Sequence, residues 1–126
     1  MHPWLIVGTG GFIGAILRYV VGGVMQRSMS AFPLGTFVVN FTGSFLLGLV
    51  MYSSEYAQLF GSDSRMFLSM GVLGAYTTMS AFSYESFRLL EDNEILLFSA
   101  NVLGTVASTI AAVYLAKVIV LLFVKI

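Results

Sequence analysis

Two stripes of amide and hydroxyl side chains lie within otherwise apolar stretches of the sequence. They consist of Thr36, Asn40 and Ser44 within residues 34–54, and of Asn101, Thr105, Ser108 and Thr109 within residues 95–123. Spacings of three and four place each stripe on one face of a helix. All of these groups can donate hydrogen bonds, and none carries a fixed negative charge. Because cation paths more often use carboxylates or carbonyl rings, the stripes favour a path for an anion or a neutral solute.

Individual members of these stripes also have simpler interpretations. Serine and threonine hydroxyls often bond to the backbone of their own helix, so the stripe carries more weight than any one of them. The amide of Asn40 either joins two helices or donates to a passing solute, and the sequence leaves both roles open.

The first apolar stretch carries a repeat of small residues that an arginine interrupts. Gly10, Gly14, Arg18 and Gly22 are each four residues apart. Small residues at this spacing let helices approach closely, and packing is the interpretation that we favour for the glycines. A guanidinium within a membrane is costly unless it is paired, reaches the interface or faces water. Arg18 is therefore either an anchor near the helix end or an attractor of anions at a pore mouth.

The third apolar stretch is the least regular. Two glycines, Gly71 and Gly74, precede a run rich in hydroxyl groups that ends at Glu85. This pattern predicts a helix that is broken within residues 74–80. A break inside a membrane frees carbonyls and amides, and it persists only within protein or around an ion. Glu85 and Arg88, three residues apart, are expected to form a pair on the helix surface.

The overall composition indicates what must position these groups. The chain has 126 residues, of which 58% are hydrophobic and 10% are charged, with six basic and six acidic residues. Soluble domains have about 25% charged residues, so we expect an integral membrane protein. The net charge of zero argues against a nucleic-acid partner. The chain has no cysteine and one histidine, which argues against thiolate or histidine metal sites and against an enzyme.

The charges divide the chain into apolar segments of membrane-spanning length. Uncharged stretches cover residues 28–54, 66–84 and 95–116, and about 20 apolar residues suffice to cross a bilayer. The prediction is an all-α fold, a single transmembrane domain over residues 1–126. It has four transmembrane helices at about 4–26, 34–54, 66–90 and 95–123, with the third broken in mid-membrane. The N-terminus lacks a basic region and a clear cleavage site, so we expect no removed signal peptide.

The distribution of basic residues gives no strong orientation. With four spans, Arg65 and Lys125 fall on one side and Arg27 and Arg88 on the other. The side richer in Lys and Arg normally becomes cytoplasmic, and here the two sides tie. We expect insertion in both orientations and an antiparallel, dual-topology homodimer in the lipid bilayer. The simpler alternative is that one orientation wins narrowly. In the dimer, two broken third helices would meet near the bilayer centre, where four freed carbonyls could hold a small cation.

Three longer motifs carry a family resemblance. They are Gly10-Gly11-x-x-Gly14-Ala15-x-x-Arg18-Tyr19, Gly35-Thr36-x-x-x-Asn40-x-x-Gly43-Ser44-Phe45-x-x-Gly48, and Gly71-x-x-Gly74-x-x-Thr77-Thr78-x-Ser80-x-Phe82-Ser83-x-Glu85. With them, the chain resembles the Fluc (CrcB) fluoride channels over essentially its full length. The resemblance implies a dual-topology homodimer with two fluoride pores, which gives passive fluoride efflux and protects the cell against fluoride toxicity. It also implies a multi-pass protein of the bacterial plasma (inner) membrane.

The resemblance also assigns roles by position. Asn40 matches the pore-lining asparagine, Phe82 one of two phenylalanines whose ring edges face fluoride, and Arg18 the arginine near the vestibule. Thr105 and Thr109, with Ser108 beside them, fall on the polar track of the last helix, and Glu85 matches a glutamate of the third. A structural Na⁺ would be held by the backbone carbonyls of Gly74 and Thr77.

One position departs from the family pattern. This chain has Met79 where the family has the other phenylalanine. An aromatic ring has a positive edge, whereas methionine offers a flexible, polarizable thioether. The departure puts the first aromatic contact with fluoride in question.

Other functions fit the sequence less well. A small multidrug or guanidinium exporter has a similar length, four helices and dual topology, but it relies on a buried carboxylate in its first helix. Residues 4–26 contain no Asp or Glu. A structural subunit without transport would not need the two polar stripes.

Overall fold

The fold consists entirely of helices within the part of the chain that the structure describes. This computed structural model describes residues 1–125. Three long helices are continuous: α1 (Pro3–Gln26), α2 (Leu34–Ala57) and α6 (Ile95–Val124). Each is long and apolar enough to cross a membrane. The segment between α2 and α6 is made of four shorter pieces: α3 (Ser62–Met66), the π-helix η1 (Phe67–Leu73), α4 (Gly74–Tyr76) and α5 (Met79–Glu91).

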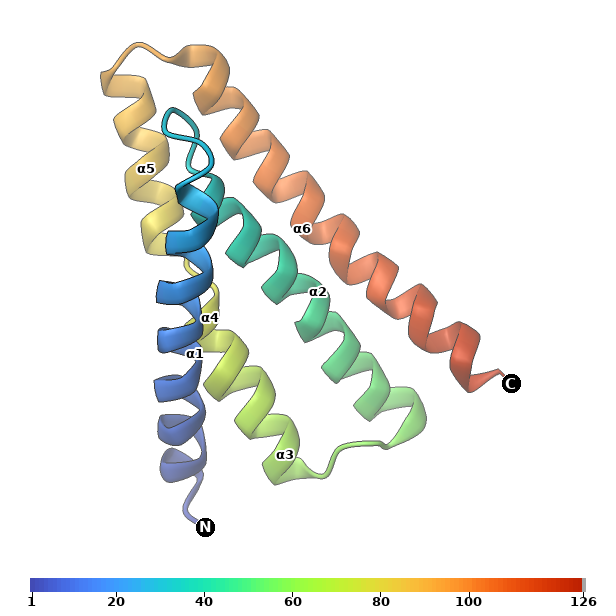
Figure 1. Cartoon of the computed structure of the whole chain (residues 1–126). Coiled ribbons are helices and arrows are strands. Elements are labelled where there is room, and N and C mark those ends of the chain that lie inside the picture. Colours follow the sequence, from blue (N-terminus) through green and yellow to red (C-terminus); the bar gives the residue numbers. More distant parts are fainter. Residues whose placement is uncertain (126) are drawn as a thin grey trace.

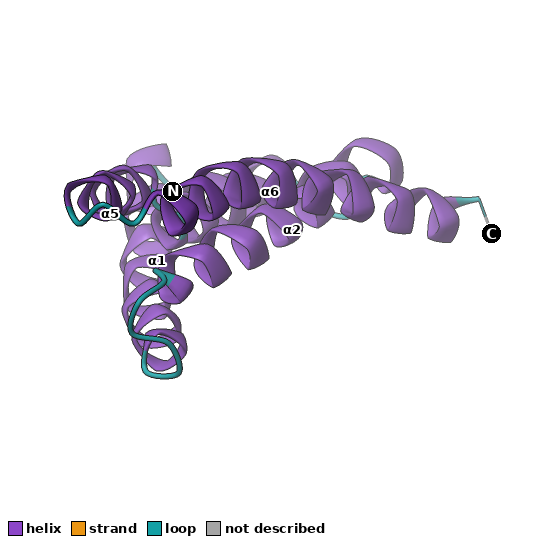
Figure 2. Cartoon of the chain, turned by 90° about the horizontal axis from the view of Figure 1, so that it is seen from above, coloured by secondary structure: helices purple, strands orange, loops and turns teal. Residues whose placement is uncertain are grey.

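The chain passes up and down through the molecule four times (Figure 1). The N-terminus, the α2–α3 connection and the C-terminus lie towards the lower end of the view, and the α1–α2 and α5–α6 connections lie at the upper end. This arrangement confirms the predicted four-span helical fold, with both termini on the same side. Helices α2 and α6 run side by side, while α1 and the third segment run in the opposite direction. Seen from above, the two pairs diverge (Figure 2).

The helix ends differ from the predicted bounds by a few residues. Helix α2 continues to Ala57 and ends where Gln58 adopts a left-handed conformation, with φ of 52°. Helix α3 begins at Ser62, four residues before the predicted start, and Asp63 lies in its first turn. An acidic side chain there is favoured by the partial positive charge of a helix N-terminus. The polar residues Ser62, Asp63 and Ser64, which lie before the predicted start of the third span, therefore belong to a helix.

Glycines form a tight seam between α1 and the third segment. A Cβ at Gly14 would overlap the carbonyl of Val72, and a Cβ at Gly10 would lie 2.7 Å from the carbonyl oxygen of Phe67. On the other side of the seam, a Cβ at Gly71 would lie 2.9 Å from the Cα of Gly10. The packing role predicted for the glycines of the first helix is therefore what the structure has at Gly10 and Gly14.

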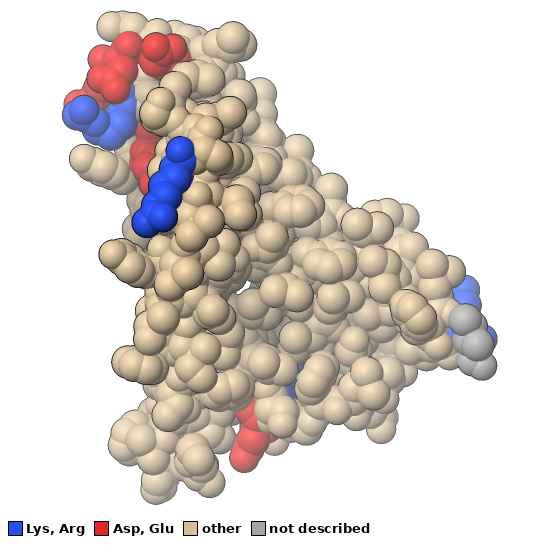
Figure 3. Space-filling model, in the orientation of Figure 1, with Lys and Arg blue, Asp and Glu red and all other residues tan. Residues whose placement is uncertain are grey.

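Charged side chains gather at the ends of the helices. Figure 3 shows basic and acidic groups mainly near the upper and lower ends of the molecule, with a broad uncharged surface between them. An uncharged band of this kind suits the hydrocarbon region of a bilayer, where exposed charges are expensive.

Candidate pore groove at the broken helix

The break in the third segment falls within the predicted interval. Thr77 and Thr78 lie between α4 and α5 and have extended backbones, with φ and ψ of −81° and 157° for Thr77 and −148° and 118° for Thr78. Two consecutive extended residues interrupt the ladder of i to i−4 hydrogen bonds that holds a helix together. The polar groups that the break frees must find other partners.

Asn40 on α2 supplies partners for both backbone groups of Thr78. The Thr78 amide donates to Asn40 Oδ1 at 2.8 Å, and Asn40 Nδ2 donates to the Thr78 carbonyl at 3.0 Å. Both residues are buried. The Thr78 side chain then caps α5, because its Oγ1 accepts the Ala81 amide at 3.2 Å. Of the two roles left open for Asn40, joining helices is therefore the one that the structure displays directly.

These bonds leave two particular carbonyls free. In an unbroken helix the Thr78 amide would donate to Gly74 and the Ala81 amide to Thr77. Here Asn40 Oδ1 takes the first amide and Thr78 Oγ1 takes the second. Within residues 1–125, no backbone hydrogen bond outside the helices and no side-chain hydrogen bond ends on the carbonyl of Gly74 or Thr77. These are the two carbonyls to which the resemblance assigns Na⁺.

A groove of about 260 Å³ lies beside the break. Of the predicted site residues, Asn40, Thr77, Met79, Phe82, Thr105 and Thr109 line it. The lining also includes Ser44 and Thr78, together with Leu47 and Val106. The structure thus brings part of each polar stripe, Asn40 and Ser44 from α2 and Thr105 and Thr109 from α6, to one groove at the point where the third segment is broken. No acidic side chain lines it.

Met79 and Phe82 both reach this groove but differ in exposure. Met79 is 73% exposed in the chain, whereas Phe82 is 8% exposed. Phe82 is therefore held by packing. Met79, as the first residue of α5, projects from the break with few neighbours to fix it.

The α6 stripe is divided between packing and the groove. Asn101, which is 2% exposed, donates to Ser86 Oγ at 2.9 Å and so ties α6 to α5. Thr105 and Thr109 line the groove, and Thr109 Oγ1 also bonds to the Thr105 carbonyl at 2.7 Å. The structure does not bring Ser108 into this groove; its hydroxyl lies 3.4 Å from the Thr105 carbonyl of its own helix.

Arg18 lines a second groove, of about 310 Å³. Thr36, Thr78 and Glu85 contribute to the same groove. Thr36 Oγ1 donates to Glu85 Oε1 at 2.9 Å, while Glu85 Oε2 is buried without a hydrogen-bond partner. Because Thr78 lines both grooves, its bonds with Asn40 lie where the two approach each other.

The predicted pair of Glu85 with Arg88 is wrong. Arg88 Nη1 lies 3.2 Å from Glu91 Oε2, which is the only ion pair found in residues 1–125. Glu85 instead turns to Thr36 on α2. The spacing of three fits both acidic partners of Arg88, and packing against α2 decides between them.

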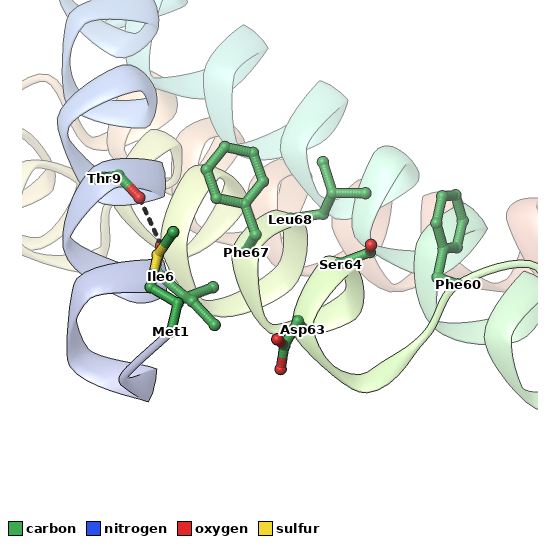
Figure 4. Close-up of a pocket in the computed structure, with 8 residues that line it drawn as sticks. All are labelled: Met1, Ile6, Thr9, Phe60, Asp63, Ser64, Phe67 and Leu68. Carbon is green, nitrogen blue, oxygen red and sulfur yellow. Dashed lines mark hydrogen bonds between the residues drawn. The ribbon is translucent and has the colours of Figure 1, made fainter.

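Another groove lies apart from the predicted site. It is formed by the N-terminal part of α1 and the start of the third segment, and Phe67, Leu68 and Ile6 give it an apolar character (Figure 4). Thr9 points its hydroxyl back to the Ile6 carbonyl of its own helix, at 3.1 Å. None of the predicted site residues lines it.

The fold and the groove together define a class: a helical membrane protein with four spans, a broken third span, and an amide- and hydroxyl-lined groove at the break. Residues 5–117 match the family model described as CrcB-like protein, Camphor Resistance (CrcB), and the chain belongs to that family.

Relatives agree with this assignment over nearly the whole chain. A protein of Methanosarcina barkeri named fluoride-specific ion channel FluC 3 is 55% identical over 121 residues, which covers 96% of this chain and 92% of that protein. FluC 1 of Methanosarcina acetivorans is 55% identical over 118 residues, 94% of this chain and 90% of that protein. FluC of Geotalea uraniireducens is 42% identical over 120 residues, which covers 94% of this chain and 97% of that protein. The chain is a multi-pass membrane protein.

Proposed function

We propose that this protein is a fluoride-selective channel that lets fluoride leave the cell passively and so protects the cell against fluoride toxicity. Family membership and the names of the relatives support this function. The observation that carries it is the groove at the break, where hydrogen-bond donors of α2 and α6 line the same space as Phe82 and no acidic side chain is among the lining residues. Because these relatives are named as channels, the proposal also agrees with the expectation that the protein is not an enzyme.

Hydrogen-bond donors in the groove can replace the hydrogen bonds that a small anion loses when it leaves water. Fluoride is strongly hydrated, so a path must replace hydrogen bonds to water with hydrogen bonds to protein. Asn40 retains one amide hydrogen beyond the one given to Thr78, and the hydroxyls of Ser44 and Thr105 line the same space. The edge of the Phe82 ring adds a region of positive potential. Fluoride passes these groups in single file, down its electrochemical gradient.

Arg18 belongs to the approach to this path. It lines the second groove with Thr36 and Glu85, and it has no ion-pair partner within residues 1–125. An unpaired guanidinium near a groove raises the local concentration of anions. Its position eight residues before the end of α1 corresponds to about 12 Å from the helix end, so its side chain can still reach water.

We infer that the protein acts as an antiparallel homodimer with both orientations in one membrane. The number of basic residues at the two ends stays equal when Arg18 and Lys117, which lie within the spans, are also counted. Arg18, Arg27 and Arg88 lie towards the end that holds the α1–α2 connection, and Arg65, Lys117 and Lys125 towards the other. Lys117 is seven residues from the end of α6, nearly as deep as Arg18. Three basic residues against three give the insertion machinery no preference.

The freed carbonyls of Gly74 and Thr77 suit a structural Na⁺. Hard cations prefer oxygen ligands, and Gly74 is exposed on the chain surface, where a second copy can approach. Two carbonyls from each of two chains would make four ligands. Within residues 1–125, no cluster of three or more His, Cys, Asp or Glu side chains competes for a metal.

The structure does not support the alternative of a small multidrug or guanidinium exporter. Helix α1 carries no acidic residue, so it lacks the buried carboxylate that such exporters use, and the family match points elsewhere.

The test is fluoride efflux from proteoliposomes that contain the purified protein, measured with a fluoride electrode. We expect rapid efflux from vesicles with the protein and none from empty vesicles. A Met79→Phe variant runs in parallel. Efflux from the variant alone would show that Met79 impairs conduction, whereas absence of efflux from both would exclude the channel function.

A further inference from the structure

Asn40 bonds to the break through both the oxygen and the nitrogen of its amide, and these two bonds fix how the amide is oriented. Its oxygen accepts the Thr78 amide at 2.8 Å and one of its two N–H groups donates to the Thr78 carbonyl at 3.0 Å. Turning the amide over would place its NH₂ against the Thr78 N–H and its oxygen against the Thr78 carbonyl, and both bonds would be lost. The Thr78 backbone therefore determines where the oxygen and the nitrogen of the Asn40 amide lie.

The same pair of bonds creates part of the carbonyl site. The Thr78 amide would close the helix onto the Gly74 carbonyl if Asn40 Oδ1 did not accept it. Asn40 thus frees the Gly74 carbonyl, while the Thr78 hydroxyl, by accepting the Ala81 amide at 3.2 Å, frees that of Thr77. The two freed carbonyls have separate causes, which makes them separable by mutation.

We propose that Asn40 is a positioning residue that couples the cation site to the anion groove. The inference rests on the proposed function, because it takes the carbonyls as Na⁺ ligands and the groove as the fluoride path. Its oxygen keeps the Gly74 carbonyl available, and its nitrogen, oriented by the same contact, presents the remaining N–H to the groove.

Coupling of this kind must act in both directions. A cation on the Gly74 and Thr77 carbonyls favours the open break, and the open break is the state that holds the Asn40 amide in place. By linkage, whatever fixes the amide also strengthens cation binding, by the same factor. Removing the contact should weaken cation binding, although Asn40 itself contributes no ligand to the cation.

Three variants distinguish the contributions. Asn40→Ala removes both bonds to Thr78, so the Thr78 amide can return to the Gly74 carbonyl. Thr78→Val removes only the hydroxyl, so the Ala81 amide can return to the Thr77 carbonyl while Asn40 keeps its backbone contacts. Ser44→Ala is the matched control, because Ser44 lies one turn further along α2 and lines the same groove. No side-chain hydrogen bond of Ser44 is found in residues 1–125.

The first measurement is thermal unfolding of the full-length protein in detergent, titrated with NaCl against N-methylglucamine chloride and without fluoride. We expect the sodium concentration for half-maximal stabilisation to rise about 10- to 100-fold in Asn40→Ala, the usual range when a supporting partner of a metal ligand is lost. Thr78→Val should show a rise as well, and Ser44→Ala should match wild type. A wild-type response to sodium in Asn40→Ala would overturn the proposal.

The second measurement reports on the amide itself and does not depend on whether Asn40→Ala folds. In the wild-type protein, the two side-chain N–H signals of Asn40 are followed by NMR, with assignment by Asn40→Asp or Ser44→Ala spectra. We expect replacement of Na⁺ by N-methylglucamine to shift these signals, and fluoride to shift chiefly the N–H that does not face Thr78. Signals that do not respond to sodium would contradict the coupling.

These readouts separate this inference from the channel function. Sodium-dependent melting and sodium-dependent amide signals in a protein without fluoride efflux would support the coupling device and refute the function. Fluoride efflux with sodium-insensitive Asn40 signals would support the function and refute the device.

Discussion

Asn40 illustrates how one residue can serve two structural purposes. The sequence shows an amide on an apolar helix and leaves open whether it joins helices or meets a solute. The bonds to Thr78, at 2.8 and 3.0 Å, make it a brace for the break. The amide hydrogen that remains is available to the groove. The same amide group therefore stabilises the break and can donate a hydrogen bond to a solute.

At the same scale, the contact of Thr36 with Glu85 predicts a measurable stability effect. Thr36→Val removes the one hydrogen bond that the Glu85 side chain accepts. Glu85 Oε1 is part-buried, and loss of an ordinary hydrogen bond costs about 0.5–1.5 kcal/mol, so we expect a lower melting temperature of the protein in detergent. Thr36→Ser keeps the hydroxyl and should remain close to wild type. Equal stability of the two variants would show that the contact contributes nothing.

Several site residues could be predicted from the sequence because their neighbours in space are also neighbours on a helical face. Asn40 and Ser44 share a face of α2, and Thr105 and Thr109 share a face of α6. The two polar stripes do not include Thr78, although a threonine directly before a helical run is an N-cap signal and its hydroxyl does accept the Ala81 amide. The partner of Glu85 could not be predicted, because it comes from another helix.

At the scale of the elements, the broken third segment is the feature that the rest of the fold supports. Its general position follows from the sequence, because glycines followed by hydroxyl residues weaken a helix. The π-helical stretch Phe67–Leu73 does not follow from the sequence, because its neighbours on α1 are distant along the chain. In the structure, Gly10, Gly14 and Gly71 let this stretch lie backbone to backbone with α1.

The seam predicts a strong difference between two glycines of the same helix. A methyl group at Gly14 would overlap the Val72 carbonyl and lie 3.1 Å from Ala75 Cβ, whereas one at Gly8 would meet nothing within 4 Å. Overpacking typically costs about 1–3 kcal/mol, so Gly14→Ala should lower the melting temperature. Gly8→Ala should not, because alanine is the better helix former. Similar melting temperatures for the two variants would mean that the seam is loose.

At the scale of the whole molecule, charged residues are few, and the basic ones are divided equally between the two ends. The broad uncharged surface between the helix ends (Figure 3) suits the bilayer, and three basic residues lie towards each end. The up-and-down topology was predictable from the lengths of the apolar stretches. The angle between the two pairs of helices could not be predicted, because it depends on which small residues of neighbouring helices contact each other.

The balance predicts that both ends of the molecule occur on both sides of the membrane. The chain has no cysteine, so single cysteines at Ser30 and at Ser62, on opposite ends, can be labelled in intact cells with an impermeant maleimide. We expect partial labelling, about half, at both positions. Adding Ser28→Lys to the Ser30→Cys chain should draw that end to the cytoplasm and reduce its labelling. Complete labelling at one position and none at the other would establish a single orientation.

The central claim is that the groove at the break selects fluoride through hydrogen-bond donors and an aromatic edge. The most direct measurement compares fluoride and chloride efflux from the same preparation of proteoliposomes, each with an ion-selective electrode and a potassium shunt. We expect rapid fluoride efflux and chloride efflux no greater than that of empty vesicles. Chloride efflux as large as fluoride efflux would contradict this claim, because the groove would then be an unselective anion path.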